Sequence, residues 1–275
     1  MKRLNSSARY VAALAMAAIG FALAPMASAQ QFTSTPAVSV SSGATAMQTA
    51  AQEGKYLFVY FWKTNDRQTQ LMQGVLQDTV GKMMDTAATV SIQITDPSHA
   101  TIVKQFGVSR APMPLVLAIA PNGAITKGLP VTFDAQQLRD AVVSTGTANC
   151  LKALQDQQLV LLCVKHEMDA HAFQGARALL QDARYSASSQ MVTIDPADPS
   201  EQAFLRSLNV DPSANKGVTV VLTPPGQPVA TFAESATKDE MVAKLTSLSS
   251  SCCPDGKCAP GQQCCPGGKC PPAAK

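Results

Sequence analysis

The sequence predicts an α/β fold made of two similar units in tandem, followed by a cysteine-rich tail. Apolar runs of strand length alternate with amphipathic helical segments through the first half of the chain, and the same order recurs in the second half. Each half also contains an Asp-Pro pair that ends a strand, at residues 96–97 and 195–196. Six of the eight cysteines lie between Cys252 and Cys270, which separates the tail chemically from the body.

The N-terminus has the features of a cleavable secretory signal. A start with three basic residues precedes the uncharged apolar stretch Val11–Leu23, and Ala27-Ser28-Ala29 supplies small residues at a cleavage site. The apolar stretch is shorter than the roughly 20 residues that a retained membrane anchor needs. We therefore expect residues 1–29 to be removed as a signal peptide and the mature protein to be exported, to the periplasm or the extracellular space.

The composition of the mature chain argues against two classes of interaction. The predicted signal holds three of the 22 basic residues and none of the 19 acidic ones, so its removal leaves equal numbers of each sign. A neutral chain without a basic stripe gives no electrostatic reason to expect nucleic-acid binding. No later segment is long and apolar enough to span a bilayer. We expect a soluble mature protein without a transmembrane segment.

The first predicted unit covers residues 44–146 and follows a leader at residues 30–43 that is rich in Gln, Ser, Thr and Pro. A short helix over residues 44–52 precedes Tyr56–Trp62, whose apolar and aromatic composition is typical of a buried central strand. The polar break at Lys63–Arg67 then leads into a longer helix. A strand is therefore followed by a turn and a helix at the centre of this unit.

The remainder of the first unit also alternates between helices and strands. We expect the longer helix to bury Leu71, Val75 and Leu76 on one face. Strands are predicted over residues 89–94 and 115–119, with a short helix between them. A hairpin turn signal follows the second of these strands.

The second predicted unit, residues 147–249, repeats this order. Its strands are predicted at Leu159–Val164, Met191–Ile194 and Val218–Leu222, with a helix over Ala172–Leu180 after the first of them. The similar order with little sequence identity favours a tandem duplication, and chance similarity of two ordinary α/β units is the alternative.

Both predicted units end in a helix that opens with a capping box. In this motif the side chain of the first residue accepts from a backbone amide three positions later, and the side chain there reciprocates. Asp134 pairs with Gln137 in this way in the first unit, and Thr237 pairs with Glu240 in the second.

The first unit resembles the thioredoxin-like fold. The segment Phe61-Trp62-Lys63-Thr64-Asn65 stands where that family runs from a buried strand into its dithiol turn. Ala111-Pro112-Met113-Pro114-Leu115 is similar to the segment that carries the family's cis-proline, which places Pro114 at the cis-proline position with Met113 before it. The resemblance implies a central mixed sheet flanked by helices in each unit. It is weaker in the second unit, where Gly217 occupies the cis-proline position.

The residues at the dithiol positions depart from the family. The resemblance aligns its two cysteines with Asp66 and Thr69, in the turn that follows Trp62. Thiol–disulfide exchange needs an attacking thiolate and a second thiol to resolve the mixed disulfide, and neither side chain supplies one. No Cys-x-x-Cys occurs anywhere in the 275 residues. Since fold does not carry function with it, we predict a redox-silent protein without catalytic residues in this turn.

Two other polar features have structural interpretations that we favour over functional ones. Asp66 at the start of a helix is expected to cap free amides, and the alternative is a ligand-binding turn. His166 and His171 are five residues apart with Asp169 between them, which is not the four-residue spacing that aligns two metal ligands on a helix. We do not expect a metal site there.

Two cysteines lie in the body of the chain. Cys163 falls in an apolar run, where cysteine is usually a small buried hydrophobe. Cys150 is placed at the beginning of the preceding helix. In an oxidising compartment the two could form a disulfide, and we keep this pairing as an alternative to two buried thiols.

The tail, residues 250–275, contains the motif Cys-Cys-Pro-x-Gly-Lys-Cys twice. Three interpretations compete: disulfides within the chain, thiolate coordination of a soft metal such as copper or zinc, and crosslinking to a partner. The even number of cysteines and the predicted export favour disulfides. The six cysteines are Cys252, Cys253, Cys258, Cys264, Cys265 and Cys270.

Three hypotheses of function follow. The leading one is an exported, redox-inactive scaffold that binds another exported protein or peptide beside Trp62–Thr69 and Met113–Pro114. The second is soft-metal binding by the tail, with copper or zinc as the candidate ion and no other cofactor expected. The third is an atypical thiol–disulfide oxidoreductase that uses the tail cysteines.

Overall fold

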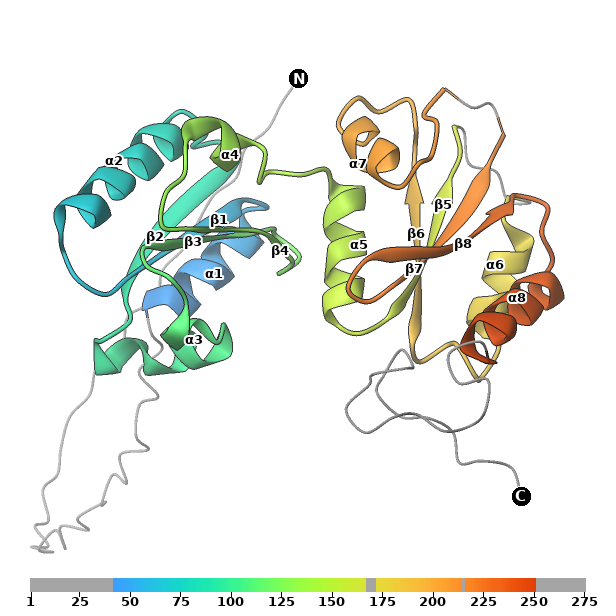
Figure 1. Cartoon of the computed structure of the whole chain (residues 1–275). Helices are drawn as coiled ribbons and strands as arrows, with labels where there is room; N and C mark the ends of the chain where they lie inside the picture. Colours follow the sequence, from blue (N-terminus) through green and yellow to red (C-terminus); the bar gives the residue numbers. More distant parts are fainter. Residues whose placement is uncertain (1–41, 167–171, 214–215, 251–275) are drawn as a thin grey trace, which may run out of the picture. The chain divides into compact units, whose positions relative to one another are not determined.

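The computed structural model, described for residues 42–166, 172–213 and 216–250, contains two α/β units (Figure 1). Each unit has a four-stranded mixed sheet flanked by helices, which confirms the predicted fold class. The predicted signal peptide and the tail cysteines lie outside the described residues. None of the helices in the described ranges combines the length and the apolar character that a bilayer crossing requires.

The first unit contains α1–α4 and β1–β4. Its strand order is β2-β1-β3-β4, with β1 parallel to β2 and antiparallel to β3, and β3 antiparallel to β4. In chain order the elements are α1 (Ser42–Gln52), β1 (Tyr56–Trp62), α2 (Arg67–Gly81), β2 (Ala87–Gln93), α3 (Ala100–Gln105), β3 (Leu115–Ile119), β4 (Ile125–Pro130) and α4 (Ala135–Arg139).

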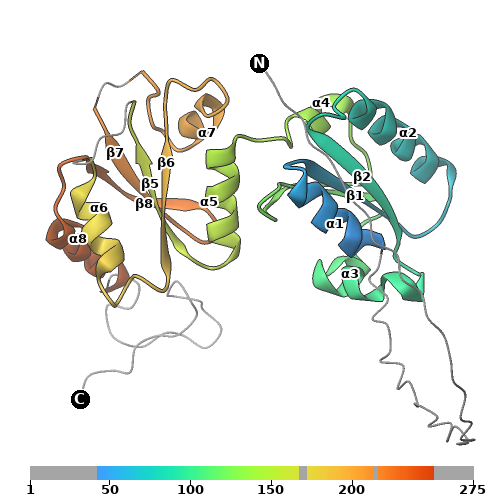
Figure 2. The same ribbon diagram turned by 180° about the vertical axis from the view of Figure 1, so that it is seen from behind.

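The second unit contains α5–α8 and β5–β8 and has the same connectivity. Its strand order is β6-β5-β7-β8, with the same alternation of parallel and antiparallel pairs (Figure 2). The predicted repetition of element order is therefore confirmed. The elements are α5 (Thr145–Gln155), β5 (Leu159–Val164), α6 (Gln174–Gln181), β6 (Ser189–Ile194), α7 (Gln202–Ser207), β7 (Val218–Thr223), β8 (Gln227–Ala233) and α8 (Lys238–Ser250).

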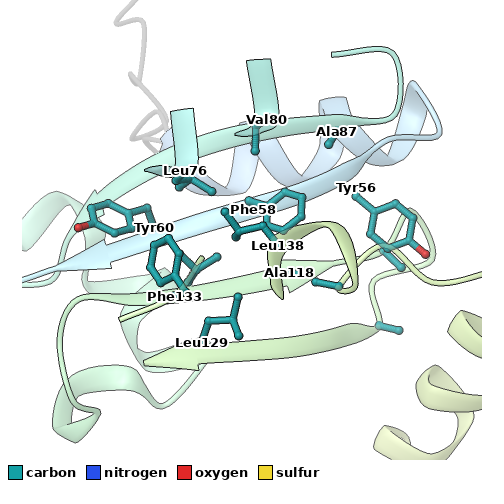
Figure 3. Packing of buried hydrophobic residues seen from close by; sticks show 14 of the residues in the cluster. Tyr56, Phe58, Tyr60, Leu76, Val80, Ala87, Ala118, Leu129, Phe133 and Leu138 are labelled. Atoms are coloured by element: carbon teal, nitrogen blue, oxygen red, sulfur yellow. The ribbon is translucent and has the colours of Figure 1, made fainter. Parts of the chain in front are cut away.

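The central strand β1 is buried on both faces, as its uninterrupted apolar sequence predicts. Tyr56, Phe58 and Tyr60 point into a cluster with side chains of α2 and α4, which Figure 3 shows. The alternate residues Leu57, Val59 and Phe61 point into a second cluster with α1 and α3. Successive side chains of a strand alternate between the faces of its sheet, so one strand anchors both layers.

The second sheet is covered in the same way. Residues of α5 and α7 pack with Val160 and Leu162 on one face of β5. Residues of α6 and α8 pack with Leu161 and Cys163 on the other face.

The helix caps predicted from the sequence are confirmed. Asp66 caps α2, and Asp134 with Gln137 forms a reciprocal capping box on α4. Thr237 and Glu240 exchange the same pair of contacts at the start of α8.

Two expectations about helices are wrong. Leu71 does not lie on the buried face of α2 but is 54% exposed, because five residues of helix turn it well away from the buried Leu76. Cys150 does not begin α5, since the side chain of Ser144 caps that helix and Cys150 lies in its middle. The domain limits drawn at residues 146 and 147 stay predictions.

Candidate binding site at the turn after the first strand

The turn between β1 and α2 brings together Trp62, Asp66 and Thr69. Trp62 ends β1, and its indole nitrogen donates to the Ser91 hydroxyl at 2.9 Å. The Asp66 carboxylate accepts from the backbone N–H of Thr69 at 2.8 Å and from the Thr64 hydroxyl at 3.0 Å. The cap fixes the entry of the chain into α2, and Thr69 is buried in its first turn.

The electrostatics of this turn keep the Asp66 carboxylate ionised and the Tyr60 phenol protonated, and they do not activate a nucleophile. The hydrogen bond from the Thr69 amide and the one from the Thr64 hydroxyl lower the pKa of Asp66. The Tyr60 hydroxyl donates to the carbonyl oxygen of Thr69 at 2.6 Å. Burial, reinforced by the negative charge of Asp66, raises the pKa of Tyr60 to about 12, so the phenol stays protonated.

Met113 and Pro114, directly before β3, are connected to the same turn through Val131. The peptide bond between them is cis. Val131, directly after β4, donates its N–H to the Pro114 carbonyl oxygen at 2.7 Å. Its own carbonyl oxygen accepts from the side-chain amide of Gln68, in the first turn of α2, at 3.2 Å. These two contacts connect the beginning of α2 to the beginning of β3.

Four apolar residues of these segments are exposed or partly exposed. Leu71 is 54% and Val131 is 41% exposed, and they are two of the three exposed large hydrophobic residues in the described ranges. Trp62 and Met113 are partly exposed. We call Trp62, Leu71, Met113 and Val131 the turn face. Sequence reasoning missed Val131, which is recognisable only once β4 is paired with β3.

The two body cysteines are free thiols, so the disulfide considered for them does not form. Cys150 packs in the cluster on one side of the second sheet, whereas Cys163 points from β5 into the cluster on the other side. Burial raises the pKa of Cys150 to about 12 and that of Cys163 to about 11. Neither thiol supplies a thiolate near neutral pH.

No metal centre is formed by the part of the chain that the structure describes. In that part, no three His, Cys, Asp or Glu side chains gather in a way that could hold an ion. His166 lies 3.0 Å from the Asp195 carboxylate, measured from Nδ1 to Oδ1, and this interaction lowers the pKa of Asp195. Asp169, His171 and the tail cysteines lie outside the described residues.

A hollow of about 450 Å³ lies between α1 and the turn that joins β3 to β4. Met47, Ala51 and Leu57 contribute to its apolar lining, and Lys55 contributes a charge. It does not include any residue of the turn face.

Both sheets have the connectivity of a thioredoxin-like fold repeated in tandem, and the first unit also has a cis-proline before β3. No protein-family model and no curated protein sequence matches the chain.

Solved structures of thioredoxin-like proteins are similar to parts of it. Thioredoxin O2 of Arabidopsis thaliana in the oxidised state is 18% identical over 34% of this chain and 78% of its own, with a TM-score of 0.29. The zinc-bound form of human ERp44 is 10% identical over 78% of this chain and 58% of its own, with a TM-score of 0.32. The reduced C-terminal domain of Neisseria meningitidis DsbD is 19% identical over 34% of this chain and 85% of its own, with a TM-score of 0.27.

Proposed function

We propose that this chain is an exported, redox-silent thioredoxin-like protein that binds an extended segment of another exported protein at the turn face. One observation carries the proposal. The positions expected to hold a dithiol are occupied by a capping carboxylate and a buried threonine, while the turn face presents exposed Leu71 and Val131 and partly exposed Trp62 and Met113. This turn retains a surface for binding and lacks the groups for exchange chemistry.

The residue types of the turn face suit an extended polypeptide. Tryptophan and methionine are common at the centres of protein interfaces, where they bury large apolar areas. Methionine also adapts its shape to different partners. An extended segment can contribute backbone hydrogen bonds along its length, and the apolar pockets then select among its side chains.

The proposal is tested by replacing the partly exposed residues of the turn face. A suitable probe is reduced, carboxymethylated α-lactalbumin, which stays unfolded and cannot exchange disulfides. We expect Trp62→Ala to weaken its binding about tenfold or more, since truncating a central tryptophan typically costs about 2 kcal/mol. Met113→Ala is expected to have a smaller effect in the same direction. Binding is measured by calorimetry, and circular dichroism checks that each variant folds.

Met84→Ala is the matched control. Met84 is 68% exposed and lies between α2 and β2, away from the turn face. If Trp62→Ala and Met113→Ala bind the probe as well as the wild type does, or if Met84→Ala loses as much affinity as they do, the turn face is not the binding site.

A second candidate function, soft-metal binding by the tail, is favoured by the placement of the thiols. The two body cysteines are buried and protonated, so any thiolate ligand has to come from the six tail cysteines. Thiolates select copper(I) and zinc over harder ions. We expect native mass spectrometry of reduced protein, prepared without oxygen and supplied with copper(I), to show bound metal that is lost when residues 251–275 are deleted. Metal-free protein under these conditions, with alkylatable tail thiols, would exclude this function.

A further inference from the structure

The two units have equivalent positions around the turn after their first strand. Phe61 pairs with Leu115 in the first sheet, and Val164 pairs with Val218 in the second, so Trp62 and Lys165 occupy equivalent places. Pro114 and Gly217 directly precede the third strand of their units.

The end of the fourth strand gives the remaining equivalence. Val131 donates its N–H to the Pro114 carbonyl oxygen at 2.7 Å, and Glu234 donates its N–H to the Gly217 carbonyl oxygen at 2.9 Å. Val131 and Glu234 are therefore also equivalent. Two residues of the turn face, Trp62 and Val131, thus have counterparts in the second unit that differ in chemistry.

The Glu234 side chain lies over Gly217. A Cβ atom added at residue 217 would come within 2.6 Å of the Glu234 carboxylate and 3.1 Å of the Phe173 ring. The carboxylate is held there by Lys165, whose ammonium lies 2.6 Å from it, and both side chains are less than one-third exposed. Glycine at residue 217 leaves the space that the carboxylate fills.

We infer that the Lys165–Glu234 ion pair closes the second unit at the edge where the first unit is open, so that each chain offers one site for an extended polypeptide. This inference rests on the function proposed above. In the first unit the equivalent residues are Trp62 and Val131, which present apolar surface. In the second unit Lys165 and Glu234 form an ion pair across the edge. An incoming strand would have to displace this pair, and neither charged group offers it an apolar contact.

The hollow next to Glu234 does not replace the lost surface. It has a volume of about 440 Å³, and its lining combines polar residues such as Gln174 and Lys238 with the small residues Gly175, Ala178 and Ala236, and contains no large apolar side chain. These residues offer no counterpart to the apolar side chains of the turn face. Among the described residues, the Lys165–Glu234 pair is therefore what distinguishes this edge from the turn face.

The number of sites tests the inference. We expect the full-length protein to bind one copy of a short synthetic segment of carboxymethylated α-lactalbumin, and Trp62→Ala to weaken that binding about tenfold or more. The double variant Lys165→Trp/Glu234→Val gives the second unit the residues of the first. It should bind two copies, and it should still bind one when combined with Trp62→Ala.

Two outcomes would overturn the inference and leave the proposed function intact. The first is a wild type with two sites, one of which survives Trp62→Ala, and the second is a double variant with no added site. Wild-type binding that Trp62→Ala leaves unchanged would instead count against the proposed function.

A second measurement does not depend on binding. Gly217→Ala should lower the Tm of the wild type, because the new methyl group displaces the Glu234 carboxylate from Lys165. The decrease should be smaller in a Glu234→Ala background, where the carboxylate is gone and only the Phe173 ring remains close to the new methyl group. Equal decreases in both backgrounds would show that Glu234 does not occupy this position in solution.

Discussion

The two units share their connectivity and differ at the edge where the first strand ends. In the first unit this edge carries Trp62 and Val131 and is apolar, whereas in the second it carries Lys165 and Glu234 and is closed by an ion pair. The helices that follow also begin differently: the Asp66 side chain caps α2, whereas the residue before α6 is Phe173, which has a left-handed backbone conformation and a side chain that cannot cap. A repeated backbone therefore does not imply a repeated surface, because a few positions at strand ends give the two units different side chains there.

The largest expected effects concern the equivalent core positions Phe58 and Leu161. Both side chains are fully buried in the central strands of their sheets. We expect Phe58→Ala to cost about 3–5 kcal/mol and Leu161→Ala about 2–5 kcal/mol of unfolding free energy, through lost burial and the cavity left behind. Chemical denaturation monitored by circular dichroism measures both. A cost below about 1 kcal/mol at either position would show that the corresponding sheet is not packed as described.

One glycine in α2 and one in α6 are expected to respond in opposite ways to replacement by alanine. A methyl group at Gly175 would lie 2.0 Å from the carbonyl oxygen of Ala236, whereas one at Gly74 would meet nothing within 4 Å. We expect Gly175→Ala to destabilise the protein by about 1–3 kcal/mol through overpacking against backbone. Gly74→Ala should stabilise it by about 1 kcal/mol, because alanine has the higher helix propensity. Urea titrations of the two variants compare them directly, and effects of the same sign would contradict the difference in packing.

The smallest expected effect concerns the Asp66 cap of α2. The pKa of Asp66 is lowered in the folded state, so its contribution to stability is fully present above the pKa of an unfolded aspartate. It is lost as the pH falls through the lower pKa of the folded state. Asp66→Ala should therefore lower the Tm slightly near pH 7, and the difference from the wild type should vanish in acid. Thermal unfolding at several pH values measures this, and a difference that is independent of pH would argue against an ionised cap.

Strands and caps could be predicted from the sequence because they depend on local chemistry. The observed limits of β1 and β5 agree with the apolar runs Tyr56–Trp62 and Leu159–Val164, and capping residues are recognised from their spacing alone. The face to which Cys163 points could not be predicted, since β5 is apolar throughout and gives no alternation to read. This is why a pairing with Cys150 remained open.

The residues that distinguish the two units were also beyond sequence reasoning. Lys165 and Glu234 are 69 positions apart and meet only when β8 pairs with β7 in one particular register. The exposed Val131 depends in the same way on the pairing of β4 with β3. None of these three residues belongs to a sequence motif, so none can be recognised before the strand pairing is known.

The burial of Cys150 and Cys163 also bears on how the rest of the chain oxidises. Eight cysteines allow 105 complete pairings and six allow 15, so withdrawing two thiols into the second core reduces the pairings roughly sevenfold. The reduction holds only once both faces of β5 are covered, because before then both thiols are accessible to oxidants and to the tail. If the second unit folds before oxidation, Cys150 and Cys163 would be excluded from disulfide formation. The order of folding and oxidation would then determine the yield of protein without wrongly paired cysteines.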